Sequence, residues 1–157
     1  IWMMSLIFYR YTFFPFSPGD LAPPYWINMG AMAISTLAGS LLIGNAPQAP
    51  FLDSLLPFLK GFTVFYWATG PWGIPMLLVL AVWRYVYKRF PLQFDPLHWG
   101  AVFPLGMYAA STHEMTAAMH FDFLGFLPPV FLGAALLAWT AAFAGVLRRI
   151  PRYLRAG

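Results

Sequence analysis

The sequence predicts an all-α integral membrane protein, and three observations support this. Hydrophobic residues make up 61% of the 157 residues and charged residues only 9%, whereas roughly a quarter of the residues in a soluble domain are charged. The apolar residues form stretches long enough for helices that cross a lipid bilayer, each of which needs about 20 residues. Most basic residues lie at the ends of these stretches. We therefore expect one transmembrane domain, with about four transmembrane helices and a partial one.

The first two helices are separated by a proline-rich segment. Residues 1–14 are apolar but shorter than the roughly 20 residues of a span, so they predict the end of a partial helix. The chain starts without methionine and as though inside a helix, which favours the C-terminal portion of a longer membrane protein. A full span follows over residues 25–44. Its small residues Ala31, Ser35 and Gly39 either let a neighbouring helix approach closely or line a pore.

The third span, residues 53–89, is too long for one straight crossing. A helix from Phe51 to Arg89 would measure about 58 Å, well beyond an apolar core of about 30 Å. We expect a break near residues 70–75, where helix-breaking residues cluster: Gly70, Pro71, Gly73 and Pro75.

The fourth span, residues 98–120, is the one around which the others are expected to pack. Pro104 lacks an amide hydrogen, so this helix should bend and leave the carbonyl of Gly100 free. Irregular backbone is tolerated at membrane depth where it is buried in protein or lines a wet cavity, so we place this helix inside the bundle. With about 3.6 residues per turn, one face combines an aromatic ring with a lone carboxylate and comprises Phe103, Met107, Ala110 and Glu114.

The last span, residues 128–148, precedes a basic tail. Its ridge of Ala134, Ala138 and Ala142 suits a closely packed partner helix. Basic residues cluster at two segment ends, namely Lys88 and Arg89 in one case and Arg148, Arg149, Arg152 and Arg155 in the other. Such clusters are typical of cytoplasmic flanks and not of a nucleic-acid surface, so we expect a multi-pass protein with a cytoplasmic C-terminus.

The sequence contains no arrangement typical of an enzyme. It has no cysteine, no paired carboxylates, no glycine-rich phosphate loop and no nucleophile beside a base. The stretch HEMTAAMH, residues 113–120, is close to a zinc motif, but Ala117 stands where the second histidine would share the helix face. We therefore expect no catalysis, no cofactor and no metal site.

Four polar or aromatic residues are candidates for a functional site. Glu114 and His113 form a possible proton or ion site, because ionisable residues at membrane depth are often functional, although a solvated structural role explains them equally well. Asn28 either bonds to a neighbouring helix or contributes to such a site. Phe103 is explained by ordinary core packing or by a hydrophobic constriction that gates a channel by excluding water.

Three stretches resemble a known family: PYWINMGAMAISTLAGSLL, LKGFTVFYWATGPWGIPMLLVLAVWRY and HWGAVFPLGMY. They are similar to the C-terminal half of the tellurite-resistance and C4-dicarboxylate transporters. That family, within the voltage-dependent anion channel superfamily, also includes the slow-type anion channels of plant guard cells, the yeast malate permease and the sulfite efflux pump. The likeness runs from about Phe8 to Arg149.

The resemblance implies a fold of ten helices in five hairpins around a central pore, assembled as a homotrimer. It implies a channel or carrier for small anions or C4-dicarboxylates, with a phenylalanine on the ninth helix occluding the pore. Matched by motif, that gate is Phe103, surrounded by Pro104, Gly106 and Met107. Two features depart from the family: the charged pair in THEM, and the absence of most of the first six helices from this chain.

Two alternatives remain open at this point. A proton-coupled dicarboxylate or malate carrier would use Glu114 or His113 as its titrating group. A membrane subunit without transport activity, acting as a scaffold, is the other. In each case the expected location is a bacterial inner membrane.

Overall fold

A computed structural model of the chain describes residues 2–15, 17, 19, 26–91 and 99–156. In this part of the chain the regular structure is helical and contains no strand, which confirms the all-α prediction. The elements are α1 (Trp2–Phe13), α2 (Ile27–Asn45), η2 (Ala46–Gln48), α3 (Pro50–Ser54), α4 (Leu56–Val82), the π-helical turn η3 (Trp83–Tyr87), α5 (Trp99–Met119), η5 (Asp122–Leu124) and α6 (Leu127–Ala156). Residues 25 and 98, where two expected spans begin, lie outside the described residues.

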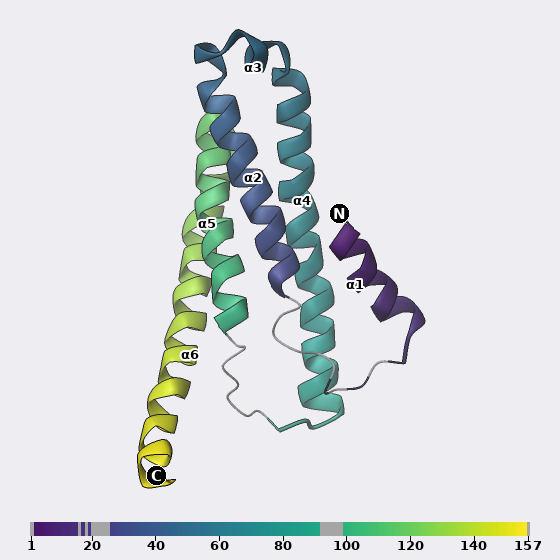
Figure 1. Ribbon diagram of the computed structural model, residues 1–157, viewed down its shortest axis with the longest axis vertical. Coiled ribbons are helices and arrows are strands. Elements are labelled where there is room, and N and C mark those ends of the chain that lie inside the picture. Colours follow the sequence, from purple (N-terminus) through teal and green to yellow (C-terminus); the bar gives the residue numbers. More distant parts are fainter. Residues whose placement is uncertain (1, 16, 18, 20–25, 92–98, 157) are drawn as a thin grey trace.

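Four long helices run along the same axis (Figure 1). Helices α2 and α5 run in one direction, and α4 and α6 run in the opposite direction. The short helix α3 joins α2 to α4 at one end of the bundle, while α1 stands beside the lower half of α4. Each long helix is therefore antiparallel to the long helix that follows or precedes it in the chain.

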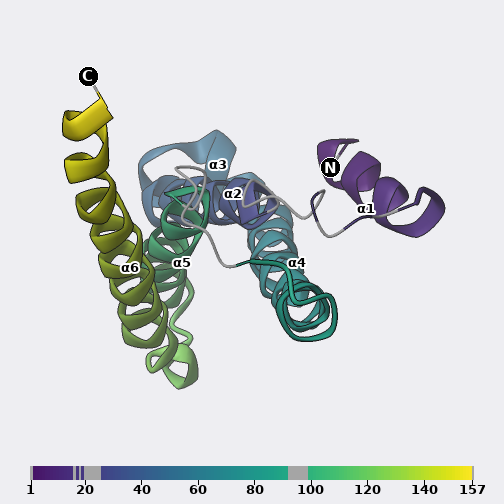
Figure 2. The ribbon, with the colours of Figure 1, turned by 90° about the horizontal axis from the view of Figure 1, so that it is seen from below.

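Seen along the axis, the helices follow the order α6, α5, α2, α4 (Figure 2). Helix α2 packs against both α4 and α5, and α5 also packs against α6. Two antiparallel hairpins, α2–α4 and α5–α6, thus meet through the parallel helices α2 and α5. We call α2 and α5 the inner pair and α4 and α6 the outer pair.

The inner pair buries small and hydroxyl side chains as well as large ones such as Met29, Tyr108 and Met115. Buried residues of α2 include Ala33, Thr36 and Ser40, and those of α5 include Ser111 and Thr112. The hydroxyl of Thr36 donates to the carbonyl of Met32 at 2.9 Å, and that of Ser40 donates to the carbonyl of Thr36 at 2.8 Å. Because these hydroxyls are satisfied within their own helix, they can be buried without water.

The packing face of α2 differs from the stripe that the sequence suggested. Ala31 is exposed and Ser35 is half-buried, whereas a Cβ at Gly39 would overlap the side chain of Thr63 on α4. Only Gly39 of the three therefore provides a close helix contact. The predicted ridge on α6 agrees better with the structure, since Ala142 is buried and Ala134 and Ala138 are half-buried.

Three helices in the described residues are long and apolar enough to cross a membrane, spanning residues 28–48, 56–87 and 122–149. Helix α5 is not among them although it has 21 residues, because proline, glycine, serine, threonine, histidine and glutamate dilute its apolar residues. It nevertheless packs against two of these spans, α2 and α6. We therefore treat α5 as lying at membrane depth, shielded on one side by its neighbours.

The break expected near residues 70–75 does not occur, because α4 is helical through both Pro71 and Pro75. Pro71 has no amide hydrogen to offer the carbonyl of Trp67, four residues earlier. The hydroxyl of Tyr108 on α5 donates to that carbonyl instead, at 3.2 Å. The long helix changes character only at the π-helical turn η3, after which the amide of Lys88 donates to the carbonyl of Trp83 at 2.9 Å.

Candidate functional site

Helix α5 has a covered side and an open side. Its covered side includes Pro104, Tyr108, Ser111, Thr112 and Met115, all buried. The opposite side carries four exposed residues, Phe103, Ala110, His113 and Ala117, which we call the open face of α5. The sequence predicted that Phe103, Met107, Ala110 and Glu114 share one side of this helix. The structure is consistent with this, since Met107 and Glu114 lie at the edge of the open face and are half-buried.

Phe103 lies where α5 meets α2. Its side chain is 54% exposed, yet a Cβ at Gly30 of α2 would stand only 3.2 Å from its Cε1 and 3.4 Å from Cγ of Pro104. Glycine at position 30 therefore makes room for the ring. One edge of the ring packs on α2, and the remainder faces outward from the contact between the inner helices.

Gly106 and Met107 differ from each other in their surroundings. A Cβ at Gly106 would have no atom within 4 Å, so this glycine leaves open space beside the chain. Met107 packs against a buried cluster of Met29, Ala33 and Tyr108. Of the predicted gate residues, Phe103 and Pro104 thus contact α2 near Gly30, whereas Met107 belongs partly to the core.

His113 and Glu114 are separated from Phe103. Ten residues of helix correspond to about 15 Å, so they lie near the opposite end of α5. His113 is exposed, Glu114 is half-buried, and the hydroxyl of Thr116 donates to the carbonyl of His113 at 2.7 Å. Within the described residues, no group of three or more histidine, cysteine, aspartate or glutamate residues could hold a metal ion.

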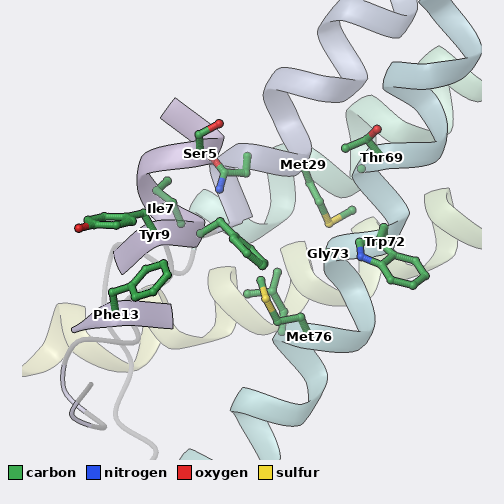
Figure 3. A pocket seen from close by; sticks show the side chains of 13 residues that line it. Ser5, Ile7, Tyr9, Phe13, Met29, Thr69, Trp72, Gly73 and Met76 are labelled. Atoms are coloured by element: carbon green, nitrogen blue, oxygen red, sulfur yellow. The ribbon is translucent and has the colours of Figure 1, made fainter. Parts of the chain in front are cut away.

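Asn28 belongs to a different region. It lines a cavity of about 500 Å³ between α1, α2 and α4, together with aromatic and aliphatic side chains such as Phe8, Trp72 and Leu77. Figure 3 shows side chains from these helices around the cavity, among them Tyr9, Met29 and Met76. Two residues along a helix turn the direction by about 200°, so Asn28 and Gly30 point to opposite sides of α2. The structure therefore separates Asn28 from Phe103.

The charged residues are distributed unequally between the two ends of the bundle. Arg10, Arg84, Lys88, Arg89 and Arg148 lie at or near the ends of α1, α4 and α6 that point downward in Figure 1. Asp53 and Asp122 lie at the other end together with a single described basic residue, Lys60, and Glu114 lies in the half of α5 nearest to them. Asp20 and Asp95 fall outside the described residues.

A group of hydrogen bonds between α4 and α5 was not anticipated from the sequence. Besides the bond from the Tyr108 hydroxyl to the Trp67 carbonyl, the indole Nε1 of Trp67 donates to Oγ1 of Thr112 at 3.0 Å. Pro71, four residues after Trp67, is the sequence signal for the freed carbonyl, and Gly70 is the signal for the space that Tyr108 occupies.

Comparison with known proteins identifies the family. The family model described as "Voltage-dependent anion channel" (SLAC1) matches residues 1–147. The chain belongs to this family. An uncharacterized membrane protein of Mycobacterium tuberculosis is 36% identical over 148 residues, which cover 93% of this chain and 74% of the relative. Two uncharacterized transporters of Methanocaldococcus jannaschii are 30% and 29% identical over 127 residues, 79% of this chain.

These matches confirm the resemblance seen in the sequence, and they do so at the level of the family. The chain is a membrane protein of an anion-transporting family. The aligned region is 35% of the length of each Methanocaldococcus transporter, so the activity of a whole transporter is a matter for proposal. No solved structure matches the chain significantly.

Proposed function

We propose that the chain forms one wall of a pore for small anions or C4-dicarboxylates and that Phe103 constricts this pore. The observation that carries the proposal is the position of Phe103, half-exposed at the contact between the inner helices and accommodated by Gly30. An apolar ring that narrows a passage at membrane depth excludes water and thereby acts as a gate. The buried neighbour Pro104 marks the point at which α5 lacks one backbone hydrogen bond.

The proposed passage would follow the open face of α5. This face consists of Phe103, Ala110, His113 and Ala117, so it offers few hydrogen-bond donors and no lysine or arginine. Anions would be favoured by weak positive potential from helix ends and from basic residues at the ends of α1, α4 and α6. Glu114 beside this face would repel anions when ionised, which is the feature that departs from a simple anion pore.

A second candidate function is a proton-coupled carrier. It is favoured by the exposure of His113 on the same face as Phe103, with Glu114 next to it. A histidine titrates near neutral pH and can pass a proton between the two sides of a membrane. The two candidates differ in whether anion movement depends on a pH gradient.

We further propose a location in a bacterial inner membrane with the basic end of the bundle in the cytoplasm, as the positive-inside rule expects. This orientation places the C-terminus of α6 inside and the connection between α2 and α4 outside. Assembly as a homotrimer is part of the same proposal. The exposed apolar side chains of the outer pair, such as Val79 and Leu137, would then be shared between lipid and neighbouring chains.

The test is anion flux through the intact protein in liposomes after Phe103→Ala. A barrier lowered by about 1.4 kcal/mol raises a rate about tenfold, so we expect a rise of roughly this size. Phe65→Ala is the matched control, because Phe65 on α4 is also 54% exposed but lies on the outer pair. It should leave the flux unchanged.

Three outcomes would change the conclusion. Equal flux in the wild-type protein and Phe103→Ala, at matched protein amounts, would remove Phe103 from the gate. Flux that vanishes without a pH gradient would favour the proton-coupled carrier over a channel. No flux in any preparation of the purified protein would favour a scaffold without transport activity.

A further inference from the structure

The contact between α4 and α5 begins with the proline at position 71. Because Pro71 offers no amide hydrogen, the carbonyl of Trp67 has no partner inside α4. A backbone carbonyl without a partner is costly at membrane depth, where no water replaces the missing bond. The hydroxyl of Tyr108 donates to this carbonyl at 3.2 Å. A side chain of α5 thus completes the hydrogen bonding of α4.

A second hydrogen bond joins the same helices, but here the donor belongs to α4 and the acceptor to α5. The indole Nε1 of Trp67 donates to Oγ1 of Thr112 at 3.0 Å. Tyr108 and Thr112 are four residues apart and therefore share one side of α5. We call the hydrogen-bonded group of Trp67, Tyr108 and Thr112 the brace. It fixes α5 to α4 at two positions, although α2 is the main packing partner of both helices.

Tyr108 and Thr112 of the brace are closely packed. Tyr108 and Thr112 are fully buried, with 0% exposure. A Cβ added at Gly70 would overlap the Tyr108 ring, with Cε2 only 2.9 Å away, so glycine is needed for the close approach. The same ring packs on Phe131 of α6, with centroids 5.3 Å apart. One side chain therefore links α5 to both outer helices.

The brace and Phe103 occupy different sides of the same helix. Phe103 and Tyr108 are five residues apart, which corresponds to a difference of about 140° in direction. Rotation of α5 that lengthened the Tyr108–Trp67 hydrogen bond would therefore also move Phe103 relative to Gly30. Pro104 lies between the two positions and removes a backbone hydrogen bond there, so the turn carrying Phe103 depends on its surroundings for its position.

We propose that the brace is a positioning device that holds Phe103 in its constricting position, and that widening of the passage requires the Tyr108–Trp67 hydrogen bond to break. Tyr108, Trp67 and Thr112 act through Phe103 as positioning residues. This inference rests on the gate role proposed for Phe103.

The central experiment is Tyr108→Phe, which removes the hydroxyl and keeps the ring. We expect anion flux through the intact protein in liposomes to rise about fivefold, which corresponds to about 1 kcal/mol for one hydrogen bond. In a Phe103→Ala background the same substitution should give no further rise, because the residue that it positions is absent. Tyr66→Phe on α4, whose ring packs on Phe62 at 4.6 Å, is the matched control and should leave flux unchanged.

A second variant separates positioning from loss of stability. Pro71→Ala provides an amide hydrogen for the Trp67 carbonyl within α4. In Pro71→Ala with Tyr108→Phe the thermal stability should recover relative to Tyr108→Phe, while the flux stays raised. If flux returns to the wild-type value together with stability, the effect came from local destabilisation and the brace has no positioning role. Should Tyr108→Phe give too little folded protein, Thr112→Val removes the acceptor for the Trp67 indole, the other hydrogen bond of the brace. This variant is also expected to raise flux.

The outcomes distinguish this inference from the proposed function. A rise in Phe103→Ala with wild-type flux in both Tyr108→Phe and Thr112→Val would overturn the brace and leave the gate intact. An equal rise from Tyr108→Phe with and without Phe103 would show that the brace does not act through that ring. Unchanged flux in Phe103→Ala would overturn the gate itself.

Discussion

The inner helix α2 is buried to a much greater extent than the outer helices α4 and α6. In the most apolar part of the span over residues 28–48, 44% of the residues are buried, compared with 11% in the corresponding parts of the spans over residues 56–87 and 122–149. The buried residues of α2 include Ala33, Thr36 and Ser40, whereas α6 exposes large side chains such as Leu137 and Phe143. In a soluble protein most of these large exposed side chains of α6 would be buried as well.

The difference shows what holds this bundle together. Lipid tails are as apolar as leucine, so burial of leucine between helices brings little gain in a membrane. Close packing of small residues and hydrogen bonds between helices are the remaining sources of stability. Here they are provided by Gly39 against Thr63 and by Trp67 with Tyr108 and Thr112. Small and hydroxyl-bearing residues therefore lie at several helix contacts, together with large buried side chains such as Met29 and Met115.

The largest effect on stability is expected for Gly39→Val. A Cβ at this position would overlap Thr63 and lie 3.1 Å from its Cβ, and overpacking of this kind costs about 1–3 kcal/mol. We expect a clear fall in the thermal midpoint of the purified protein, measured by size-exclusion chromatography after heating. Gly44→Val on the same helix is the control, since a Cβ there would meet nothing within 4 Å. Similar losses in both variants would contradict the role of Gly39 in packing.

An intermediate effect is expected for Gly30→Ala, where the inner pair meets the proposed gate. The new Cβ would lie 3.2 Å from Cε1 of Phe103, so the ring must move by a few tenths of an ångström. The Phe103 ring can move only away from α2, toward the proposed passage. We therefore expect the passage to narrow. A barrier raised by about 0.4 kcal/mol would lower anion flux about twofold. Gly61→Ala on α4, where a Cβ would meet nothing within 4 Å, is the control and should keep wild-type flux. A rise in flux for Gly30→Ala would contradict the proposed direction.

The smallest effect is expected for Leu137→Ala on the outer pair. Leu137 is 73% exposed, and exposed substitutions usually change stability by less than about 0.5 kcal/mol. The thermal midpoint should therefore stay close to that of the wild-type protein. Ala135→Leu sharpens the comparison. Ala135 is only 6% exposed and belongs to the helix that packs on α5, so a larger side chain there should lower the thermal midpoint clearly. A larger fall in the thermal midpoint for Leu137→Ala than for Ala135→Leu would contradict this difference between exposed and buried positions of α6.

Much of the architecture was accessible from sequence because it depends on local properties. Long apolar stretches predict the helices, and the basic clusters beside them predict a membrane location. The motif around Phe103 and Pro104 indicated the family, which the comparisons confirm. The gate role of Phe103 stays a prediction, as do the roles of His113 and Glu114.

The interruption expected in α4 illustrates why the remainder was not accessible. Proline at position 71 indicates a break only if nothing else satisfies the carbonyl that it frees. That partner, the Tyr108 hydroxyl, is 41 residues away from Trp67 in the sequence. Likewise, the pairing of Gly30 with Phe103, and with it the separation of Asn28 from Phe103, depend on how α2 is rotated against α5.

The amino-acid sequence by itself determined that this chain is a helical membrane protein, because composition and helix length decide which segments lipid can accept. Its likeness to known sequences determined the family. Tertiary structure alone decided which side of each helix is covered. In a membrane, large apolar residues suit lipid and protein almost equally, so their pattern does not specify rotation. Close contacts at Gly30, Gly39 and Gly70, and the hydrogen bonds of Trp67, set that rotation and with it the direction in which Phe103 points.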